Sequence, residues 1–459
     1  MRPISARLLL LGATLSSAVL HAEVKPNVLF TDGAVLQRGQ NVPVWGTAND
    51  GEKVTVEFAG QTATTTAQGG KWKLELKPLK AGGPFSMKIS GDNEVTVNNL
   101  LVGEVWVASG QSNMEWTINR FSQLEAEKPK ANFPQIRMFT VTTVTSLTPL
   151  DEVQGKWQES SPETVGDFSA VAFFFARDLQ AKLGVPVGII STSWGGTPAQ
   201  AWTSAEGFEG QPELKDYADQ LKAAVIPEHG PHHLPAALYN AMIAPVIPYG
   251  IKGVIWYQGE SNAGQSKQYQ TLFPAMIADW RAKWKLGDFP FLYVQIAPYK
   301  DQPPEIREAQ FLTLAKSKNT AMTVTTDCGD ANDIHPKQKE PVGHRLSLAA
   351  RALAYGEKIV YSGPLYQEMK AAGGKAWISF SHVGGGLVAK DGGLKGFTLA
   401  GADGKFVPAK AVIEGDKVVV SAEGVADPKA VRYGWKNVPD VNLFNKEGLP
   451  ASPFRTDVP

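Results

Sequence analysis

Four short segments of this chain carry the residue types that acyl transfer needs, and each follows an apolar run. They hold a serine, a pair of glycines, side-chain amides, and a carboxylate beside a histidine, at 110–113, 194–197, 258–262 and 327–336. If the apolar runs are parallel strands, the segments meet at the carboxyl edge of the sheet, where open α/β sheets bind ligands. This convergence predicts a site in which a serine hydroxyl attacks a carbonyl carbon.

Ser112 is the predicted nucleophile and His335 the predicted base. A serine hydroxyl needs a base because its free pKa is far too high, and an imidazole with an ordinary pKa near ~6.5 suits that role. Asp333 lies two residues before the histidine, and in an extended segment such positions face the same way. Its carboxylate is therefore predicted to hold the imidazole in the required tautomer.

An oxyanion intermediate needs preorganised hydrogen-bond donors. The predicted donors are the Ser112 amide, an amide of Gly195 or Gly196, and a side-chain amide of Asn262 or Gln258. Each residue alone has a simpler structural reading, because serine and asparagine cap helices and loops and paired glycines form turns. Their joint placement after four predicted strands favours catalysis.

Three aspartates spaced by three residues, Asp327, Asp330 and Asp333, invite a metal interpretation. They do not match a calcium loop, in which the ligands alternate and a glycine has a fixed place. We therefore predict no metal site.

The elements that position these segments lie between residues 100 and 356, where strands alternate with helices. Predicted strands are 105–109, 187–191, 252–257, 291–296 and 321–326, and predicted helices are 170–183, 269–284, 306–317 and 337–355. Gly184 is the predicted glycine that closes the first of these helices. Such alternation predicts an α/β domain whose parallel sheet is covered on both faces.

Short strands with a period of two residues flank this domain on both sides. They are predicted at 54–58, 71–76, 85–90 and 94–97, and again at 376–380, 396–400, 411–413, 417–420 and 431–435. The pattern predicts β-sandwich-like segments at both ends of the chain. Because each alone offers a small core, we expect the two to pack together as one flanking module.

The first 22 residues have the layout of a secretory signal peptide. Arg2 and Arg7 precede an apolar run that is too short to span a membrane, and Leu20-His21-Ala22 offers a cleavage site. We expect a periplasmic or secreted protein with no membrane partner after signal removal. Its lone Cys328 cannot form an internal disulfide, so its stability must come from the core.

The charge balance argues against nucleic-acid partners. The 459 residues include 45 Lys and Arg and 45 Asp and Glu, so the formal net charge is zero. No bulk field therefore attracts a polyanion.

Together these segments resemble the SGNH-hydrolase superfamily and, within it, the sialate O-acetylesterase family of secreted carbohydrate esterases. The motifs that carry the resemblance are Val-Pro-Val-Trp-Gly at 42–46, Gly-Glu-Val-Trp-Val-Ala-Ser-Gly-Gln-Ser-Asn-Met at 103–114, Ser-Trp-Gly-Gly-Thr at 193–197, Trp-Tyr-Gln-Gly-Glu-Ser-Asn at 256–262, Asp-Ile-His-Pro at 333–336, Arg-Tyr-Gly-Trp at 432–435 and Asn-Leu-Phe-Asn at 442–445. They cover nearly the whole mature chain.

The resemblance implies a three-layer α/β/α catalytic domain that uses Ser112 and His335 without metal or organic cofactor. The implied organisation is a signal peptide at 1–22, an N-terminal β domain at 23–100, the esterase domain at 101–356 and a C-terminal β region at 357–459. The superfamily usually has Asp where this chain has Gln111, and an acid where it has Asn332. The latter departure leaves Asp333 as the predicted orienting acid.

The expected activity is hydrolysis of O-acetyl esters on carbohydrate through an acetyl-enzyme. The resemblance favours O-acetylated sialic acid, whose carboxylate Arg120 could bind, and Gln111 and Glu260 are further predicted substrate contacts. Acetylated xylan or xyloglucan is the alternative substrate and would favour an aromatic groove, for which the candidates are Trp116, Trp194, Trp202 and Trp256. A non-catalytic carbohydrate-binding protein is the remaining alternative.

Overall fold

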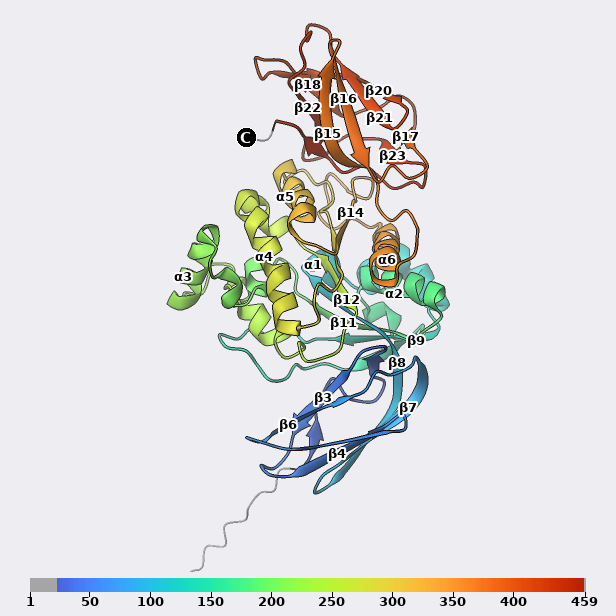
Figure 1. The fold of residues 1–459 in the computed structure, drawn as a ribbon, viewed down its shortest axis with the longest axis vertical. Helices are drawn as coiled ribbons and strands as arrows, with labels where there is room; N and C mark the ends of the chain where they lie inside the picture. The colour runs from blue at the N-terminus through green and yellow to red at the C-terminus, as the bar shows by residue number, and fades with distance from the viewer. Residues whose placement is uncertain (1–22, 458–459) are drawn as a thin grey trace, which may run out of the picture.

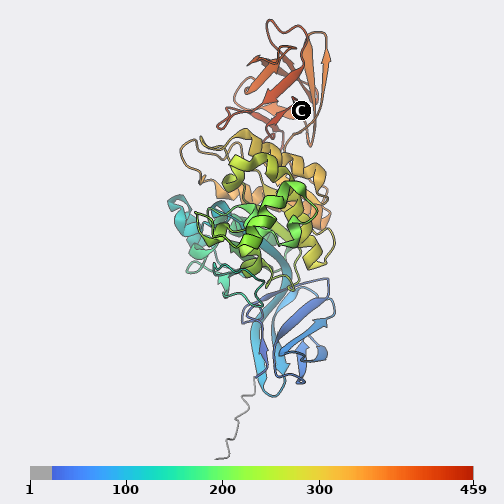
Figure 2. The same cartoon turned by 90° about the vertical axis from the view of Figure 1, so that its left-hand side faces the viewer.

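The computed structural model describes residues 23–457, which form three units in a row along the long axis of the molecule (Figure 1). The N-terminal β unit lies at one end, an α/β domain in the middle and the C-terminal β unit at the other end, and the view turned by 90° shows the same order (Figure 2). Our expectation that the two β segments pack together is wrong, because the whole α/β domain separates them. The predicted signal peptide lies outside the described residues.

The central sheet has the strand order β10-β9-β11-β8-β12-β13-β14. All neighbouring pairs on this path are parallel except β10 with β9. The strands span Trp157–Ser160 (β10), Phe133–Thr140 (β9), Val187–Ser193 (β11), Glu94–Gly110 (β8), Gly253–Tyr257 (β12), Phe291–Val294 (β13) and Thr320–Thr323 (β14).

Helices cover both faces of this sheet. Side chains of α2 (Ala170–Leu183) and α6 (Lys339–Tyr355) join the core on one face, and those of α4 (Ser266–Trp284) and α5 (Pro304–Lys316) join the core on the other. Along β12, Val254 and Trp256 belong to one core and Ile255 and Tyr257 to the other. Every residue of β12 is buried, as expected for a parallel strand covered on both sides. The predicted three-layer α/β/α architecture is confirmed.

Two shorter helices complete the α/β domain. They are α1 (Ser112–Glu115), which follows β8, and α3 (Lys215–Ala223), which lies on the surface. As predicted, α2 ends at Gly184, which has a φ of 64°.

The N-terminal β unit is continuous with the central sheet through β8. One of its sheets contains β1 (Lys25–Pro26), β3 (Val42–Thr47) and β6 (Lys71–Leu76), and the other contains β2 (Val35–Gln37), β4 (Lys53–Phe58), β5 (Gln61–Thr66) and β7 (Gly82–Ser90). The first half of β8 pairs with β7 and its second half pairs with β11 and β12. One strand therefore belongs to both units.

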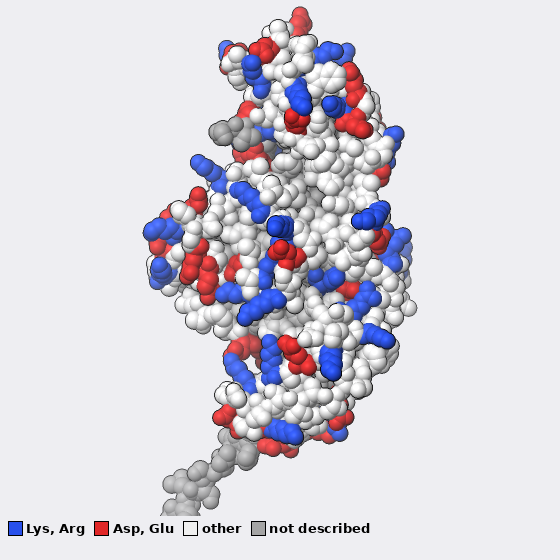
Figure 3. All heavy atoms as spheres, in the orientation of Figure 1, with Lys and Arg blue, Asp and Glu red and all other residues white. Residues whose placement is uncertain are grey.

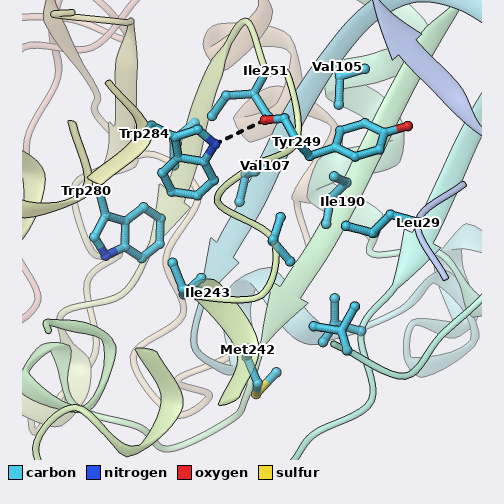
Figure 4. Close-up of a cluster of buried hydrophobic side chains, with 14 of the residues drawn as sticks. Leu29, Val105, Val107, Ile190, Met242, Ile243, Tyr249, Ile251, Trp280 and Trp284 are labelled. Carbon is cyan, nitrogen blue, oxygen red and sulfur yellow. Dashed lines mark hydrogen bonds between the residues drawn. The ribbon is translucent and has the colours of Figure 1, made fainter. Parts of the chain in front are cut away.

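The core also crosses this junction (Figure 4). Leu29 of the N-terminal unit lies in the same cluster as Val105 and Ile190 of the central sheet and Trp284 of α4. The Tyr249 hydroxyl donates to the backbone carbonyl of Val35 at 2.8 Å, so a polar contact joins the units as well.

The C-terminal β unit has a core of its own. Its strands are β15 (Leu365–Ala372), β16 (Lys375–Ser381), β17 (Leu387–Ala389), β18 (Phe397–Ala400), β19 (Phe406–Pro408), β20 (Lys410–Glu414), β21 (Lys417–Ser421), β22 (Ala430–Tyr433), β23 (Leu443–Asn445) and β24 (Phe454–Arg455). Polar contacts attach it to the α/β domain, among them an ion pair between Arg455 Nε and Glu308 Oε1 at 2.7 Å.

Lys and Arg are interspersed with Asp and Glu over the face shown in Figure 3. Between residues 23 and 457, no helix combines the length and apolar character that a membrane crossing requires.

Candidate active site

The predicted nucleophile, Ser112, lies on a tight turn from β8 into α1. Gly110 ends the strand with a φ of 136°, and a Cβ atom there would lie 2.1 Å from the backbone oxygen of Tyr257. Only glycine fits this close approach between neighbouring strands. The next amide, that of Gln111, donates to the same Tyr257 oxygen at 3.0 Å, and α1 begins at Ser112. The turn therefore holds Ser112 at the carboxyl edge of the sheet.

The structure brings Ser112 and His335 into direct contact. The Nε2 atom of His335 lies 2.9 Å from the Ser112 hydroxyl oxygen, which is hydrogen-bond distance for a nucleophile and its base. The serine is only 8% exposed. Burial lowers the pKa of His335, the nearby Lys339 lowers it further, and Asp333 raises it. The imidazole is therefore biased toward the neutral form that can accept a proton.

Asp333 lies beside His335 but contacts its backbone more closely than its ring. Oδ1 accepts the His335 backbone N–H at 2.8 Å, whereas the same atom lies 3.7 Å from the ring Nδ1. The longer distance exceeds that of a hydrogen bond. An orienting role for Asp333 stays a prediction, and this geometry supports an ionic contact.

An aromatic ring covers the base. The Trp116 indole lies on the His335 imidazole with ring centroids 3.7 Å apart and an angle of 17° between the planes. The Arg120 guanidinium lies over the same indole, 5.7 Å from its centroid. Arg120 is exposed, so its charge faces solvent at the rim of the site.

The paired glycines after β11 lie next to the nucleophile. A Cβ atom on Gly195 would lie 3.3 Å from the Ser112 Cβ. The Gly195 amide donates to Glu115 Oε2 at 2.8 Å, and burial raises the pKa of this carboxyl. Gly196 has a φ of 75°. Because Glu115 already accepts the Gly195 N–H, the role of either glycine as an oxyanion donor stays a prediction.

Gln258 and Asn262 support the loops around the site. Gln258 Nε2 donates to the Thr197 carbonyl at 3.2 Å and to Asn262 Oδ1 at 2.7 Å, so both of its hydrogens are engaged. Asn262 Nδ2 donates to Gln200 at 3.0 Å. Both residues are buried, and these contacts tie the loop after β12 to the loop after β11.

Gln111 and Glu260 are buried as well. Gln111 Oε1 accepts the amide of Ser261 at 3.2 Å, while Glu260 Oε1 accepts Asn113 Nδ2 at 2.7 Å. The second Glu260 oxygen is buried without a hydrogen-bond partner, and burial raises the pKa of this carboxyl. Both residues therefore hold the loop after β12 against the turn that carries Ser112. A contact of either residue with substrate stays a prediction.

A buried lysine lies close to the predicted pair of Ser112 and His335. Lys339, the first residue of α6, donates from Nζ to Asn113 Oδ1, and burial lowers its pKa to about 7. Asn113 also donates to the backbone carbonyl of Ile334 at 3.0 Å. This network connects the nucleophile turn to the loop that carries His335.

Several other residues that the sequence offered as metal or substrate contacts have structural roles instead. Asp327 forms an ion pair with Arg345 at 2.6 Å. Trp202 and Trp256 are fully buried, so they belong to the core and cannot line a groove. Trp194 is half-buried and stacks with His232, with ring centroids 4.9 Å apart. Within residues 23–457, no group of three or more His, Cys, Asp or Glu side chains is arranged to hold a metal ion.

The sequence reasoning missed four residues around the catalytic pair. These are Asn113, Glu115, Trp116 in its contact with His335, and Lys339. A signal existed for three of them, because Asn113, Glu115 and Trp116 directly follow Ser112 in the chain. Lys339 gave none, since a lysine in a predicted helix normally faces solvent.

Comparisons with known proteins show the family to which the chain is similar. A sequence model of the family described as carbohydrate esterase, sialic acid-specific acetylesterase, matches residues 102–352. Human sialate O-acetylesterase is 32% identical over 394 residues, which cover 74% of this chain and 72% of that protein. The mouse sialate O-acetylesterase is 32% identical over 406 residues, covering 74% and 75%.

A solved structure is similar over nearly the full length. The crystal structure of a novel carbohydrate acetylesterase from Xanthomonas citri superposes with a TM-score of 0.88. The two chains are 42% identical, and the match covers 95% of this chain and 99% of that one. The similarity includes both flanking β units as well as the α/β domain.

Proposed function

Because this chain belongs to the carbohydrate esterase family of sialic acid-specific acetylesterases, and is therefore a carboxylic ester hydrolase, we propose that it removes O-acetyl groups through an acetyl-enzyme on Ser112. One contact supports this mechanism above all others: the 2.9 Å approach of His335 Nε2 to the Ser112 hydroxyl. It joins a nucleophile and a base across the carboxyl edge of the sheet.

The reaction follows from this pair in two halves. Ser112 Oγ attacks the acetyl carbonyl carbon while His335 Nε2 takes the hydroxyl proton. The same proton then passes to the sugar oxygen as its bond to the acetyl carbon breaks. In the second half, His335 deprotonates a water that attacks the acetyl-enzyme, and acetate and free Ser112 are formed.

The oxyanion is stabilised by backbone donors. The Ser112 amide lies at the first residue of α1 and is one such donor. Gly195 and Gly196 are the second source, and the Gly195 donor becomes available when substrate displaces the Glu115 carboxylate. Asn262 remains a candidate, while Gln258 supports it from behind.

O-acetylated sialic acid is our first candidate substrate. The family and the curated relatives carry that specificity in their names. Arg120 adds a physical reason, because its exposed guanidinium lies over the ring that covers the catalytic base and can attract a carboxylate. Gln111 and Glu260 then act by shaping the loops that line the sugar site.

Acetylated xylan or xyloglucan is the second candidate. Trp194 directly follows the carboxyl end of β11, its ring stacks on that of His232, and the two rings offer an aromatic surface that suits a neutral sugar. Arg120 would then have no carboxylate to bind.

The decisive experiment is acetate release by the purified mature protein. O-acetylated sialic acid, acetylated xylan and acetylated xyloglucan are offered in parallel to the wild type, to Ser112→Ala, and to Ser381→Ala as a control on β16. We expect Ser112→Ala to lose on the order of 10⁶-fold in kcat, as triad knockouts do, and the control to keep its activity. A quenched reaction should also carry one acetyl group on the peptide that contains Ser112.

The choice of substrate is tested by Arg120→Ala. If sialic acid is the substrate, the KM for O-acetylated sialic acid rises about 10-fold or more, because a charge-assisted hydrogen bond is lost, and turnover of a neutral acetyl ester is unchanged. Preferential release from the plant polymers by the wild type would replace the substrate and keep the mechanism. Equal release by Ser112→Ala would overturn Ser112 as nucleophile and revive a binding function.

We also propose export to the periplasm or the medium, on the strength of the charged and apolar pattern of residues 1–22. Amino-terminal sequencing of the exported protein should give Glu23 as its first residue. Retention of the full-length chain inside the cell would contradict this proposal.

A further inference from the structure

The catalytic histidine lacks the hydrogen bond that normally fixes such a ring. In a serine–histidine–aspartate triad the aspartate accepts a hydrogen bond from Nδ1 and so holds the ring's orientation. Here that distance is 3.7 Å, and the aspartate oxygen accepts the backbone N–H of His335 instead. Some other contact must set the plane of the imidazole.

The Trp116 indole is in the right place to do so. Its ring lies nearly parallel to the imidazole, with 3.7 Å between the centroids and 17° between the planes. A stacked ring at this distance restricts tilting of the imidazole but leaves Nε2 free at its edge to face Ser112.

The indole is itself held by the nucleophile turn. The Trp116 amide donates to the Ser112 carbonyl at 2.8 Å, and the Trp116 carbonyl accepts the Ala170 amide at the start of α2 at 3.0 Å. Its ring also packs against Phe121, with centroids 5.6 Å apart. Ser112 and the ring that covers its base therefore belong to one rigid turn.

We propose that Trp116 is the positioning residue for His335, holding the imidazole against Ser112 and stabilising the imidazolium that forms as Ser112 loses its proton. This inference rests on the proposed esterase mechanism. An aromatic face attracts a cation that lies over it, so the interaction strengthens as the imidazole becomes charged. A contact that is stronger in the transition state than in the ground state accelerates the reaction.

The charges around His335 show why such help is needed. Lys339 on α6 and burial both oppose the imidazolium, and Asp333 in the same loop favours it only through a longer contact. Arg120 lies over the same indole as a second cation, and Glu115 on α1 accepts the Gly195 amide beside Ser112. The indole is uncharged, so its face can favour the imidazolium at short range without placing another charged group beside Ser112.

The test compares Trp116→Phe with Trp116→Leu. Phenylalanine keeps an aromatic face, whereas leucine covers the imidazole without one. We expect Trp116→Leu to lower kcat about 10-fold with little change in KM, and Trp116→Phe to restore most of the loss. The control is Trp377→Leu on β16, which removes a tryptophan from the C-terminal unit and should leave kcat and KM unchanged.

A second readout follows the imidazole directly. NMR titration of the His335 ring, assigned by the loss of its signal in His335→Gln, should give a lower pKa in Trp116→Leu than in Trp116→Phe, by about half a unit. The acid limb of kcat/KM should shift in the same direction. This measurement does not depend on turnover, so it stands even if the chain proves not to release acetate.

Two results would overturn the inference. Equal His335 pKa values and equal kcat in the phenylalanine and leucine variants would show that the indole only fills space. A rise in KM at unchanged kcat would make Trp116 a substrate contact instead. Absence of acetate release by the wild type would defeat the esterase proposal separately, and the NMR comparison would still decide the role of the indole.

Discussion

Asp333 acts on the ring of His335, the predicted base, through its charge rather than through a hydrogen bond to that ring. Its Oδ1 atom lies 3.7 Å from His335 Nδ1, and the carboxylate raises the pKa of the imidazole, whereas burial and Lys339 lower it. Asp333 is 43% exposed, so water weakens its effect. The pKa of the His335 imidazole is therefore less sensitive to Asp333 than it would be to a buried carboxylate that is hydrogen-bonded to the ring.

We accordingly expect Asp333→Asn to lower kcat/KM by about 10- to 100-fold, well short of the ~10⁴-fold loss in kcat seen for a hydrogen-bonded triad aspartate. The neutral imidazole is the base, so activity rises with pH through the His335 pKa, which lies below its ordinary value. Removing the negative charge should move this acid limb to still lower pH. Initial rates of acetate release across pH measure both effects.

A loss near ~10⁴-fold, or an acid limb that moves to higher pH, would contradict this expectation. The first result would mean that the Asp333 hydrogen bond forms once substrate is bound, and the second would mean that the Asp333 carboxylate does not favour the charged imidazole.

The pair of Lys339 and Glu260 gives a prediction about stability. Both side chains are buried, and both bind the amide group of Asn113. Lys339→Met and Glu260→Gln should each lower the free energy of unfolding by roughly 3 kcal/mol, because the first removes the donor to Asn113 Oδ1 and the second removes the negative charge that faces the buried Lys339. The double variant should lose less than the sum of the two.

Urea denaturation of the four proteins measures this coupling. Lys337→Met is the matched control, because Lys337 is exposed and its loss should change the unfolding free energy by less than about 0.5 kcal/mol. Additive losses in the double variant would show that the two side chains do not interact.

At the scale of elements, the turn between β8 and α1 depends on Gly110. Alanine there would need a φ of 136° and would bring its Cβ within 2.1 Å of the Tyr257 backbone oxygen. We expect Gly110→Ala to lower the unfolding free energy by about 3 kcal/mol or more and to abolish acetate release, because β8 and β12 must separate.

Gly393→Ala is the control for that variant. Gly393 has no atom within 4 Å of the position of a Cβ, so alanine should be tolerated in thermal unfolding and in activity. Wild-type behaviour of Gly110→Ala would show that the turn can relax.

The regular elements of the α/β domain were predictable because their signals are local. Gly184 closes α2 as expected, and the apolar run that begins at Val105 becomes the buried half of β8. The strand β9 was missed, since it contains Arg137, which a sequence pattern assigns to solvent. This arginine is buried because its guanidinium donates to backbone carbonyls of Gly33 and Pro134, and the first of these lies far away in the chain.

The same distinction applies to the site. Ser112 and His335 were predictable because each follows an apolar run at the edge of the sheet, and the structure brings them to 2.9 Å. The sequence shows that Glu115 and Trp116 lie close to Ser112, but it does not predict that Glu115 accepts the Gly195 amide or that Trp116 stacks on His335. Both contacts depend on how segments far apart in the sequence pack together.

At the scale of the whole molecule, the two β units differ in how they are attached. The N-terminal unit shares β8 and a continuous core with the α/β domain, whereas the C-terminal unit has a separate core. Our expectation of a single flanking module is wrong because the N-terminal unit shares its core with the α/β domain, whereas the C-terminal unit forms a core of its own.

We therefore expect two unfolding transitions in differential scanning calorimetry. Residues 365–455 should unfold in one, and the N-terminal unit together with the α/β domain in the other. Arg455→Ala should lower the midpoint of the first transition by removing the pair with Glu308, and Lys395→Ala, at an exposed pair, should leave it unchanged. A single two-state transition, or separate unfolding of the N-terminal unit, would contradict this division.

The length of β8 limits which insertions and deletions this fold can tolerate. The strand runs from Glu94 to Gly110 with a register shift against β7 between Val97 and Leu100, so no linker separates the N-terminal unit from the residues that precede Ser112. Inserting or deleting one residue would move every side chain beyond that point in the strand to the opposite face of the sheet. Related proteins should therefore tolerate substitutions in this strand better than insertions or deletions. Related chains should therefore align here without gaps, even where few residues are identical.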